Sequence, residues 1–211
     1  MKAPLRSLPL FALALLIASL PAAAAKEKKA LTAPGTYIDW QDEIDDLEII
    51  ESFKLADYSR VVVEPFDTSN TPLPEEADNA YQPVRKVLAD ATSPFVTSLR
   101  EELKGKVEVA EGEKGSAASI GAEEKTLVVR GRVTTMDPGS RAARYWAGFG
   151  AGAARTGIAA EVVDGATGKV LLRFQQERRS GVGAAGGSYE NLLERNLRKI
   201  GEDAALILGA F

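Results

Sequence analysis

The side chains available for chemistry in this sequence are carboxylates, amines, guanidinium groups and hydroxyls, because its 211 residues include no histidine and no cysteine. This absence removes triads built on histidine, thiol nucleophiles, disulfides and nearly every kind of zinc site. Adjacent acids such as Asp42 and Glu43 occur, but a glycosidase pair is set by tertiary separation, so sequence neighbours carry little specificity. The acidic loop 67–78 lacks the EF-hand pattern. We therefore expect no enzymatic activity, no metal site and no cofactor.

The most unusual segment is 137–155, in which glycines alternate with other residues after two aromatic side chains. A nucleotide-binding loop follows a strand and opens a helix, whereas these glycines precede a predicted strand, so that interpretation is disfavoured. Alternate glycines strip one face of side chains and let a backbone, a ring or a subunit approach closely. The predicted contact site consists of aromatic anchors, arginines and glycines: Arg141, Arg144, Tyr145, Trp146, Phe149 and Arg155, with Gly148, Gly150 and Gly152.

The residues alone leave three interpretations of this segment open. It is a bulged strand whose glycines let a helix pack tightly on a sheet, or an aromatic patch for a protein partner or another copy of the chain. The third interpretation is a short membrane-seeking loop over 145–154. We adopt the partner patch as the candidate site. A second glycine-rich stretch, 180–188, is interpreted as a connection, because Glu190 in the next helical turn would repel an anion.

Residues 1–25 have the form of a secretory signal peptide, with a basic lead, an apolar run over 8–20 and small residues up to Ala25. The apolar run is shorter than the roughly 20 residues that a spanning helix needs. We expect cleavage near Ala25 and, with no cysteine to carry a lipid, a periplasmic or secreted protein that is not a lipoprotein. The formal net charge of −4 gives no bulk attraction to nucleic acid, so we expect no nucleic-acid partner.

Hydrophobic periodicity predicts the elements that position the candidate site. In the acidic stretch 37–57, apolar residues at spacings of three and four predict a short amphipathic helix or a docked surface segment. These residues are Trp40, Ile44, Leu47, Ile50 and Phe53. Residues 60–66 form a β-branched run that predicts a buried strand, and 84–103 repeat with the helical period. Pro94 interrupts that repeat, so two abutting helices or one kinked helix fit equally well.

The second half predicts an antiparallel meander of strands over 126–135, 156–164 and 169–178, after a short strand at 106–110. Residues 164–168 suit a hairpin turn, and Ser188 can cap a final helix. The order β, α, β, β, β, α predicts an α/β fold of α+β type, with a mixed four- or five-stranded sheet and two main helices packed on one face. We divide the chain into a signal peptide (1–25), an acidic extension (26–57) and a single domain (58–211). Cross-strand charge pairs are expected on the open face from Arg130, Arg132, Glu161, Arg173 and Glu177.

Four segments together resemble a family of small secreted bacterial envelope proteins classed as a domain of unknown function. They are 58–66, 127–133, the arginines of 138–144 with the GFGAG run of 148–152, and the D-x-x-T-G-K pattern within 163–169. The resemblance implies an envelope location and offers no activity, so it assigns no catalytic residue. More distantly, the strand 61–66 and its following helix resemble the α/β modules of the curli secretion lipoprotein and of the TolB N-terminal region, which serve assembly and interaction.

The interpretation that joins these observations is a non-enzymatic binding or assembly module of the periplasm or cell envelope. We expect it to act by self-association or on an envelope protein, through the edge of its sheet and the segment 141–155. One alternative is a carrier of a small ligand or lipid, which needs an apolar cavity between helices and sheet. The other is a hydrolase using carboxylates, which needs a pocket where polar groups converge and a carboxylate has a shifted pKa.

Overall fold

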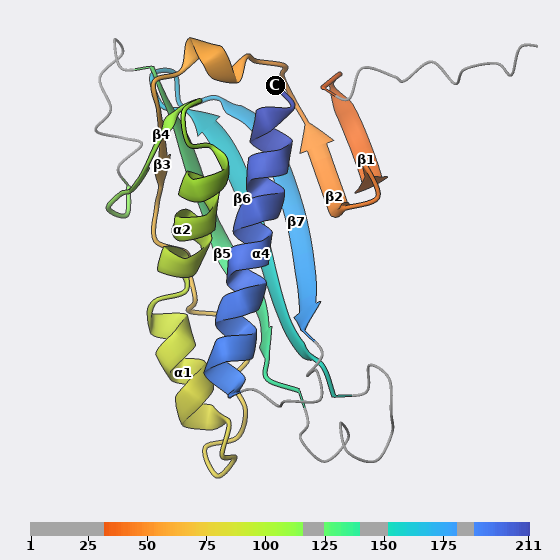
Figure 1. The fold of residues 1–211 in the computed structure, drawn as a ribbon, viewed down its shortest axis with the longest axis vertical. Coiled ribbons are helices and arrows are strands. Elements are labelled where there is room, and N and C mark those ends of the chain that lie inside the picture. Colours follow the sequence, from red (N-terminus) through yellow and green to blue (C-terminus); the bar gives the residue numbers. More distant parts are fainter. Residues whose placement is uncertain (1–31, 116–124, 140–151, 181–187) are drawn as a thin grey trace, which may run out of the picture.

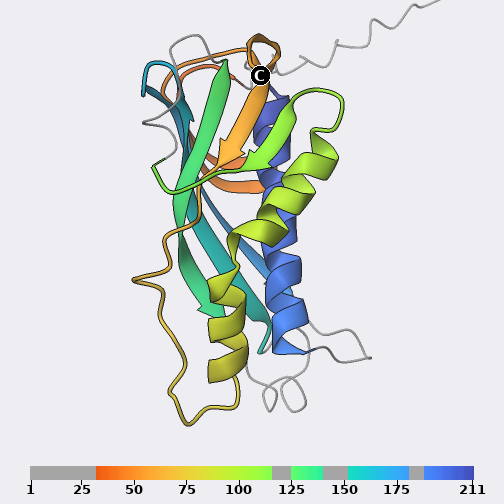
Figure 2. The ribbon, with the colours of Figure 1, turned by 90° about the vertical axis from the view of Figure 1, so that its left-hand side faces the viewer.

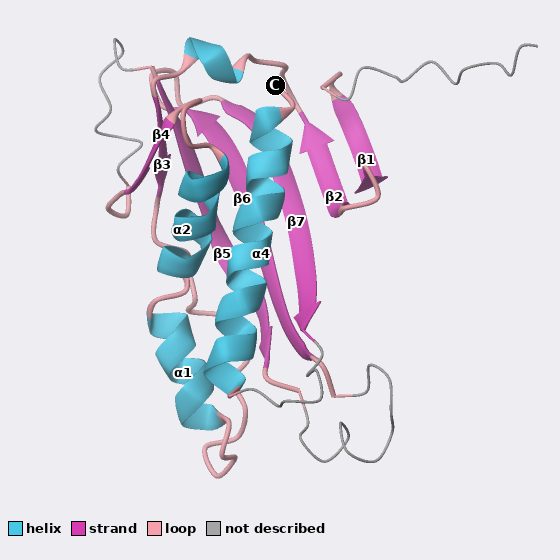
Figure 3. Ribbon diagram, in the orientation of Figure 1, coloured by secondary structure: helices cyan, strands magenta, loops and turns pink. Residues whose placement is uncertain are grey.

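The computed structural model describes residues 32–115, 125–139, 152–180 and 188–211, which form a mixed α/β fold (Figures 1 and 3). The described strands are β1 (Gly35–Trp40), β2 (Ile44–Ile49), β3 (Arg60–Val63), β4 (Glu108–Glu111), β5 (Thr126–Asp137), β6 (Ala154–Asp164) and β7 (Val170–Ser180). The described helices are α1 (Tyr81–Ala89), α2 (Thr92–Glu102) and α4 (Tyr189–Gly209), with a 3-10 turn at Leu55–Asp57. In these ranges, no helix combines the length and the apolar character that a membrane span requires.

All seven described strands join one sheet in the order β1-β2-β7-β6-β5-β3-β4. β3 runs parallel to both of its neighbours, and the other pairs are antiparallel. The expected α/β class is confirmed, but the expected four or five strands and two helices are wrong. β1 and β2 are additional strands, and the helical repeat over 84–103 divides into α1 and α2. Pro94 is the third residue of α2, where its missing N–H costs no intrahelical hydrogen bond.

The predicted meander is confirmed as β5, β6 and β7, and the final helix begins after the predicted cap. The Ser188 hydroxyl accepts a hydrogen bond from the Asn191 backbone N–H, as an N-cap does. β5 and β6 extend two residues further than expected toward the segment that joins them. A register shift between Val133 and Thr135 marks a bulge in this hairpin. The two long strands therefore carry the ends of the joining segment to one end of the sheet.

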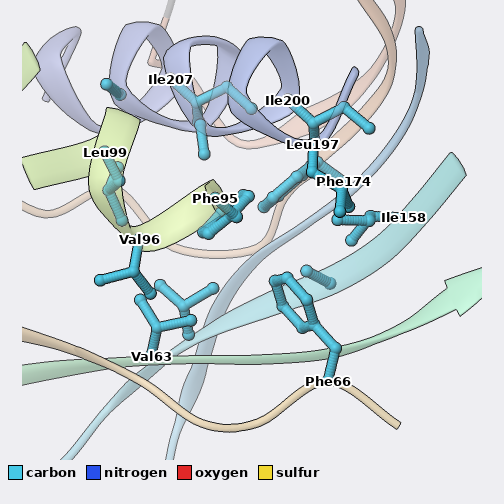
Figure 4. Packing of buried hydrophobic residues seen from close by; sticks show 14 of the residues in the cluster. Val63, Phe66, Phe95, Val96, Leu99, Ile158, Phe174, Leu197, Ile200 and Ile207 are labelled. Carbon is cyan, nitrogen blue, oxygen red and sulfur yellow. The ribbon is translucent and has the colours of Figure 1, made fainter. Parts of the chain in front are cut away.

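The hydrophobic core lies between one face of the sheet and the helices, which all cover that same face (Figure 2). Alternate residues of β6 and β7, such as Ile158 and Phe174, point into it and are buried. Phe66 and Phe95 pack with their ring centroids 5.0 Å apart in a T-shaped contact (Figure 4). α4 adds a stripe of buried residues that includes Leu197 and Ile200. The opposite face of the sheet is covered by none of the described helices.

The acidic stretch, expected to be a short amphipathic helix or a docked surface segment, forms the hairpin β1–β2. Trp40, Ile44 and Leu47 are buried against the core, so the apolar spacing is real, but two short strands produce it. Their tight turn places Gln41 and Asp42 at positive φ, a conformation that a helix excludes. β2 pairs with β7, so the contact that selects the strand lies far along the chain. The apolar edge of this segment therefore packs on the core as part of the sheet, which neither alternative had specified.

α2 and α4 cross at Gly201. An added Cβ at this position would lie 2.4 Å from the backbone carbonyl oxygen of Phe95. A glycine inside a 21-residue helix has a cost in helix propensity, so a specific contact has to compensate. Here the missing side chain lets the two helix backbones approach each other over the sheet.

Candidate functional site

We define the open face as the sheet surface opposite the helices, formed by alternate residues of β5, β6, β7 and β2. In the middle of these strands its members are exposed or half-buried, whereas residues between them, such as Leu47, Ala160 and Phe174, are buried in the core. The strand registers place eight of them in two rows that run across the strands. The first row is Arg130, Glu161, Arg173 and Glu48, and the second is Arg132, Ala159, Gln175 and Asp46.

The first row is a continuous chain of ion pairs across four strands. Glu161 binds Arg130 on one side, with 2.7 Å between Oε1 and Nε, and Arg173 on the other, with 3.3 Å between Oε2 and Nε. Arg173 also donates from Nη1 to Glu48 at 3.0 Å, and this hydrogen bond raises the pKa of the guanidinium. The predicted cross-strand pairs are therefore confirmed for Arg130, Glu161 and Arg173. Glu48 was not predicted as a partner, because no strand was predicted over its segment.

Within these four strands, the second row has charges at its two ends and small or neutral side chains between them. Beyond β5, Asp67 is the backbone bridge partner of Arg132 and lines the same hollow. Arg132 and Asp46 are exposed, and neither makes an ion pair within 4.0 Å with another described residue. Ala159 forms the floor between them, beside Gln175, and a hollow of about 460 Å³ lies over this region. The expected pairing of Arg132 is therefore wrong for the described residues. Glu177, also expected in a cross-strand pair, instead binds Arg179 on its own strand at 3.0 Å.

A larger groove of about 810 Å³ lies at the end of the sheet where β5 ends and β6 begins. Gly139, at φ +70°, lies so close to the backbone just before β6 that an added Cβ would lie 2.2 Å from the carbonyl oxygen of Gly152. We call the close approach of Gly139 and Gly152 the neck. The groove walls include the neck and the exposed Leu73 from the loop before α1. Asp137 and Arg155 form an ion pair across the strands at 2.7 Å.

Two residues of the predicted contact site are described, and both lie at this neck. Arg155 is exposed at the start of β6 and bound to Asp137, while Gly152 has φ +73° just before the strand. β6 begins at Ala154, so the glycine-rich run does precede a strand. The other predicted members lie outside the described residues: Arg141, Arg144, Tyr145, Trp146, Gly148, Phe149 and Gly150. Their role as a contact site stays a prediction.

The D-x-x-T-G-K pattern forms the β6–β7 turn. Asp164 Oδ1 accepts hydrogen bonds from the backbone N–H and the hydroxyl of Thr167, both at 2.8 Å, and Gly168 adopts φ +70°. Asp164 Oδ2 accepts from the Tyr58 hydroxyl at 2.8 Å. Burial raises the pKa of Asp164, but the hydrogen bonds from Tyr58 and Thr167 outweigh it, so the pKa lies below its ordinary value. This pattern therefore has a structural role that its sequence does not reveal, since Tyr58 precedes β3.

A second charged cluster joins β7 to α4. Arg178 donates from Nε to Oδ2 of the buried Asp203 at 2.6 Å and from Nη2 to Glu43 at 3.0 Å. Burial raises the pKa of the Asp203 carboxyl, while the guanidinium opposes that shift. Among the described residues this cluster comes nearest to what a carboxylate hydrolase needs. Both oxygens of Asp203 are bound to Arg178, however, which leaves them poorly placed to accept a proton from a substrate. No three acidic side chains in the described ranges are arranged to hold a metal ion.

Comparison with known proteins places these features in a family. A family model described as "Domain of unknown function (DUF4410)" matches residues 61–185. That span runs from β3 to just beyond β7 and includes β5, β6 and the D-x-x-T-G-K turn. The expected resemblance to a domain of unknown function is confirmed at this level. No curated protein matches the sequence.

Several solved structures have a partly similar chain. The PelC dodecamer from Paraburkholderia phytofirmans has a TM-score of 0.47 and 15% identity, over 74% of this chain and 94% of that chain. A DUF330 protein from Xanthomonas campestris has a TM-score of 0.38 and 15% identity, over 72% and 84%. Lipoprotein GNA1162 from Neisseria meningitidis has a TM-score of 0.28 and 14% identity, over 72% and 94%.

Proposed function

We propose a role for this chain, which belongs to the family of the domain of unknown function DUF4410. It is a non-enzymatic binding or assembly module of the bacterial cell envelope that acts by self-association or on a protein partner. The observation that carries the proposal is the open face, where four strands present an ordered row of charges beside a hollow floored by Ala159. Side chains already fixed by mutual ion pairs lose little conformational freedom when a partner binds.

The composition of the open face suits recognition of a protein surface with complementary charge. Charges held in a fixed order steer encounters and select orientation more than they add affinity. The hollow over Ala159 and Gln175 offers room for a side chain of the partner. Neither the carrier nor the hydrolase alternative has equal support. The carrier needs an apolar cavity where the core residues of Figure 4 pack, and the hydrolase needs a free carboxylate where Arg178 binds Asp203.

The envelope location in this proposal rests on the leader. Residues 1–25 have the three parts of a secretory signal peptide, and the chain has no cysteine that could carry a lipid. We therefore place the mature protein in the periplasm or outside the cell. The aromatic residues Tyr145, Trp146 and Phe149 belong to the proposal as anchors, because aromatic side chains among arginines are typical of interfaces. Gly139 and Gly152, the described residues on either side of their segment, both line the larger groove.

Photo-crosslinking in the intact envelope tests this function. A photoreactive amino acid replaces Gln175 on the open face, Trp146 in the aromatic segment, or Arg198 on the exposed side of α4 as the control. We expect protein adducts from positions 175 and 146 and none from 198. Adducts that are absent at 175 and 146, or equal at all three positions, would overturn the proposal.

A further inference from the structure

The charges of the open face are arranged with opposite signs at its two margins. In the first row they alternate across β5, β6, β7 and β2 as Arg130, Glu161, Arg173 and Glu48. In the second row, Arg132 lies on β5 and Asp46 on β2, with Ala159 and Gln175 between them. Both rows are therefore positive on β5 and negative on β2. If either row is turned round, so that its β2 residue takes the place of its β5 residue, each charge takes the place of a charge of opposite sign.

A two-fold axis that lies between two sheets, parallel to their strands, performs this reversal. We propose that two copies of this chain pack open face to open face about such an axis, midway between β6 and β7. Arg132 then lies opposite Asp46 of the second copy, and Glu161 lies opposite Arg173 of the second copy. The proposal rests on the proposed function and names its partner as the chain itself.

Arg132 and Asp46 are the residues that most require this arrangement. Neither makes an ion pair within 4.0 Å with another described residue, although the first row is fully paired. Asp67, the backbone bridge partner of Arg132, lies beyond β5 in the same hollow and compensates that charge only at longer range. Within one chain, β6 and β7 separate them by three strand spacings, or about 14 Å. They cannot pair with each other inside one copy. Across the axis they meet, and the two-fold symmetry forms the contact twice.

The floor of the open face allows the two sheets to approach. β6 presents the small side chain of Ala159 there, and the hollow of about 460 Å³ lies over it. Packed sheets lie about 10 Å apart and cross at about 30°, so contact concentrates near the axis and the strand ends diverge. This divergence matters because Arg155, at the start of β6, and Arg179, near the end of β7, are cross-strand neighbours. Without it, each of them would face the other arginine in the second copy. The contact is therefore limited to the two rows.

Charge exchange tests the proposal by sedimentation of the mature chain from residue 26. Arg132→Glu places like charges opposite Asp46, and Asp46→Arg does the same opposite Arg132, so each should weaken the dimer about tenfold or more. The double variant Arg132→Glu, Asp46→Arg recreates both pairs and should return the dimer Kd to within about threefold of wild type. Arg198→Glu on α4 is the control and should change nothing. A wild-type chain that is monomeric, or a double variant as weak as the two losses combined, would overturn the inference.

Cysteine trapping gives a second readout that does not depend on charge. The chain has no cysteine, so Arg132→Cys with Asp46→Cys introduces the only two thiols. A disulfide needs Cα atoms within about 7 Å, which is less than the spacing of about 10 Å between packed sheets, so a bismaleimide with a spacer of about 10 Å is used in its place. We expect a covalent dimer at micromolar protein with this reagent, and none from the control pair Arg198→Cys with Asp46→Cys. Equal trapping by both pairs contradicts the arrangement. If trapping fails while position 175 still crosslinks to another envelope protein, this inference falls and the proposed function stands.

Discussion

The Asp164 carboxylate binds its own turn and a residue more than a hundred positions earlier in the chain. Thr167 donates to it within the β6–β7 turn, and the Tyr58 hydroxyl donates to it from the segment that precedes β3. The pKa of Tyr58 is raised well above its ordinary value, mainly by burial of the hydroxyl and next by its hydrogen bond to Asp164. The same bond lowers the pKa of Asp164. The pair is therefore a neutral phenol and a carboxylate at neutral pH, and it holds the turn against the body.

This pairing makes part of the stability dependent on pH. Because the folded-state pKa of Asp164 lies below the unfolded value of about 3.9, its stabilisation is complete above that pH and is lost as the pH falls through the folded-state pKa. Asp164→Asn should lower the free energy of unfolding by about 1 kcal/mol at pH 7. The difference from wild type should shrink below about pH 4. Urea unfolding across this range measures both effects. Glu101→Gln, an exposed change on α2, is the control, and a pH-independent loss in Asp164→Asn would contradict the account.

At the scale of elements, the crossing of α2 over α4 depends on one missing side chain. The carbonyl oxygen of Phe95 occupies the space where a Cβ at Gly201 would lie. Neighbouring core residues such as Leu99 and Leu197 are fully buried, so the helices have little freedom to move apart. α2 and α4 can cover the face of the sheet together only when they pack this closely at Gly201.

Replacing Gly201 with alanine should therefore destabilise the protein, although alanine has the higher helix propensity. Alanine in a helix interior is normally favoured over glycine by about 1 kcal/mol, but overpacking against a backbone atom costs about 1–3 kcal/mol. We expect Gly201→Ala to lower the free energy of unfolding by about 1–2 kcal/mol. Gly209→Ala, in the last turn of the same helix, meets only the flexible end of Lys106 and should be neutral or slightly stabilising. Thermal unfolding of both variants measures this, and a more stable Gly201→Ala protein would refute the close crossing.

Local patterns predicted the elements whose partners are near in sequence. The alternation in β5, β6 and β7 and the cap at Ser188 led to the right strands and helix, and Arg130, Glu161 and Arg173 were correctly expected to pair. The hairpin β1–β2 was missed because Trp40, Ile44 and Leu47 have a spacing that also suits a helix. Only the pairing with β7 decides between the two. Glu48 and Asp46 were missed with it, so the negative margin of the open face could not be predicted.

At the scale of the whole molecule, the hairpin β1–β2 extends the sheet beyond the span that the family model matches. That span begins at residue 61 and ends at 185, so it leaves out β1, β2 and α4. Yet Trp40 and Ile44 are buried in the core cluster, and α4 supplies a large share of the cover. The division into an acidic extension and a domain beginning at residue 58 stays a prediction, and the stability of the hairpin can test it.

Trp40→Ala should lower the free energy of unfolding by about 3–5 kcal/mol if the hairpin is part of one cooperative unit. Ile38→Ala on the same strand is the control, because Ile38 is 75% exposed and its loss should change stability little. Urea unfolding followed by circular dichroism measures both. Equal, small effects of the two substitutions would mean that residues 58–211 fold and remain stable without the hairpin.

The pairing of β2 with β7 has a consequence for how the chain folds during synthesis. Arg173 meets Glu48 across 125 positions of sequence. A ribosome that adds about 5–20 residues per second leaves the first hairpin waiting roughly 6–25 seconds for its partner strand. Throughout that delay Trp40 and Ile44 have no core to enter. A holding chaperone that shields the nascent hairpin should therefore raise the yield of native protein more than one that arrives after β7 has emerged.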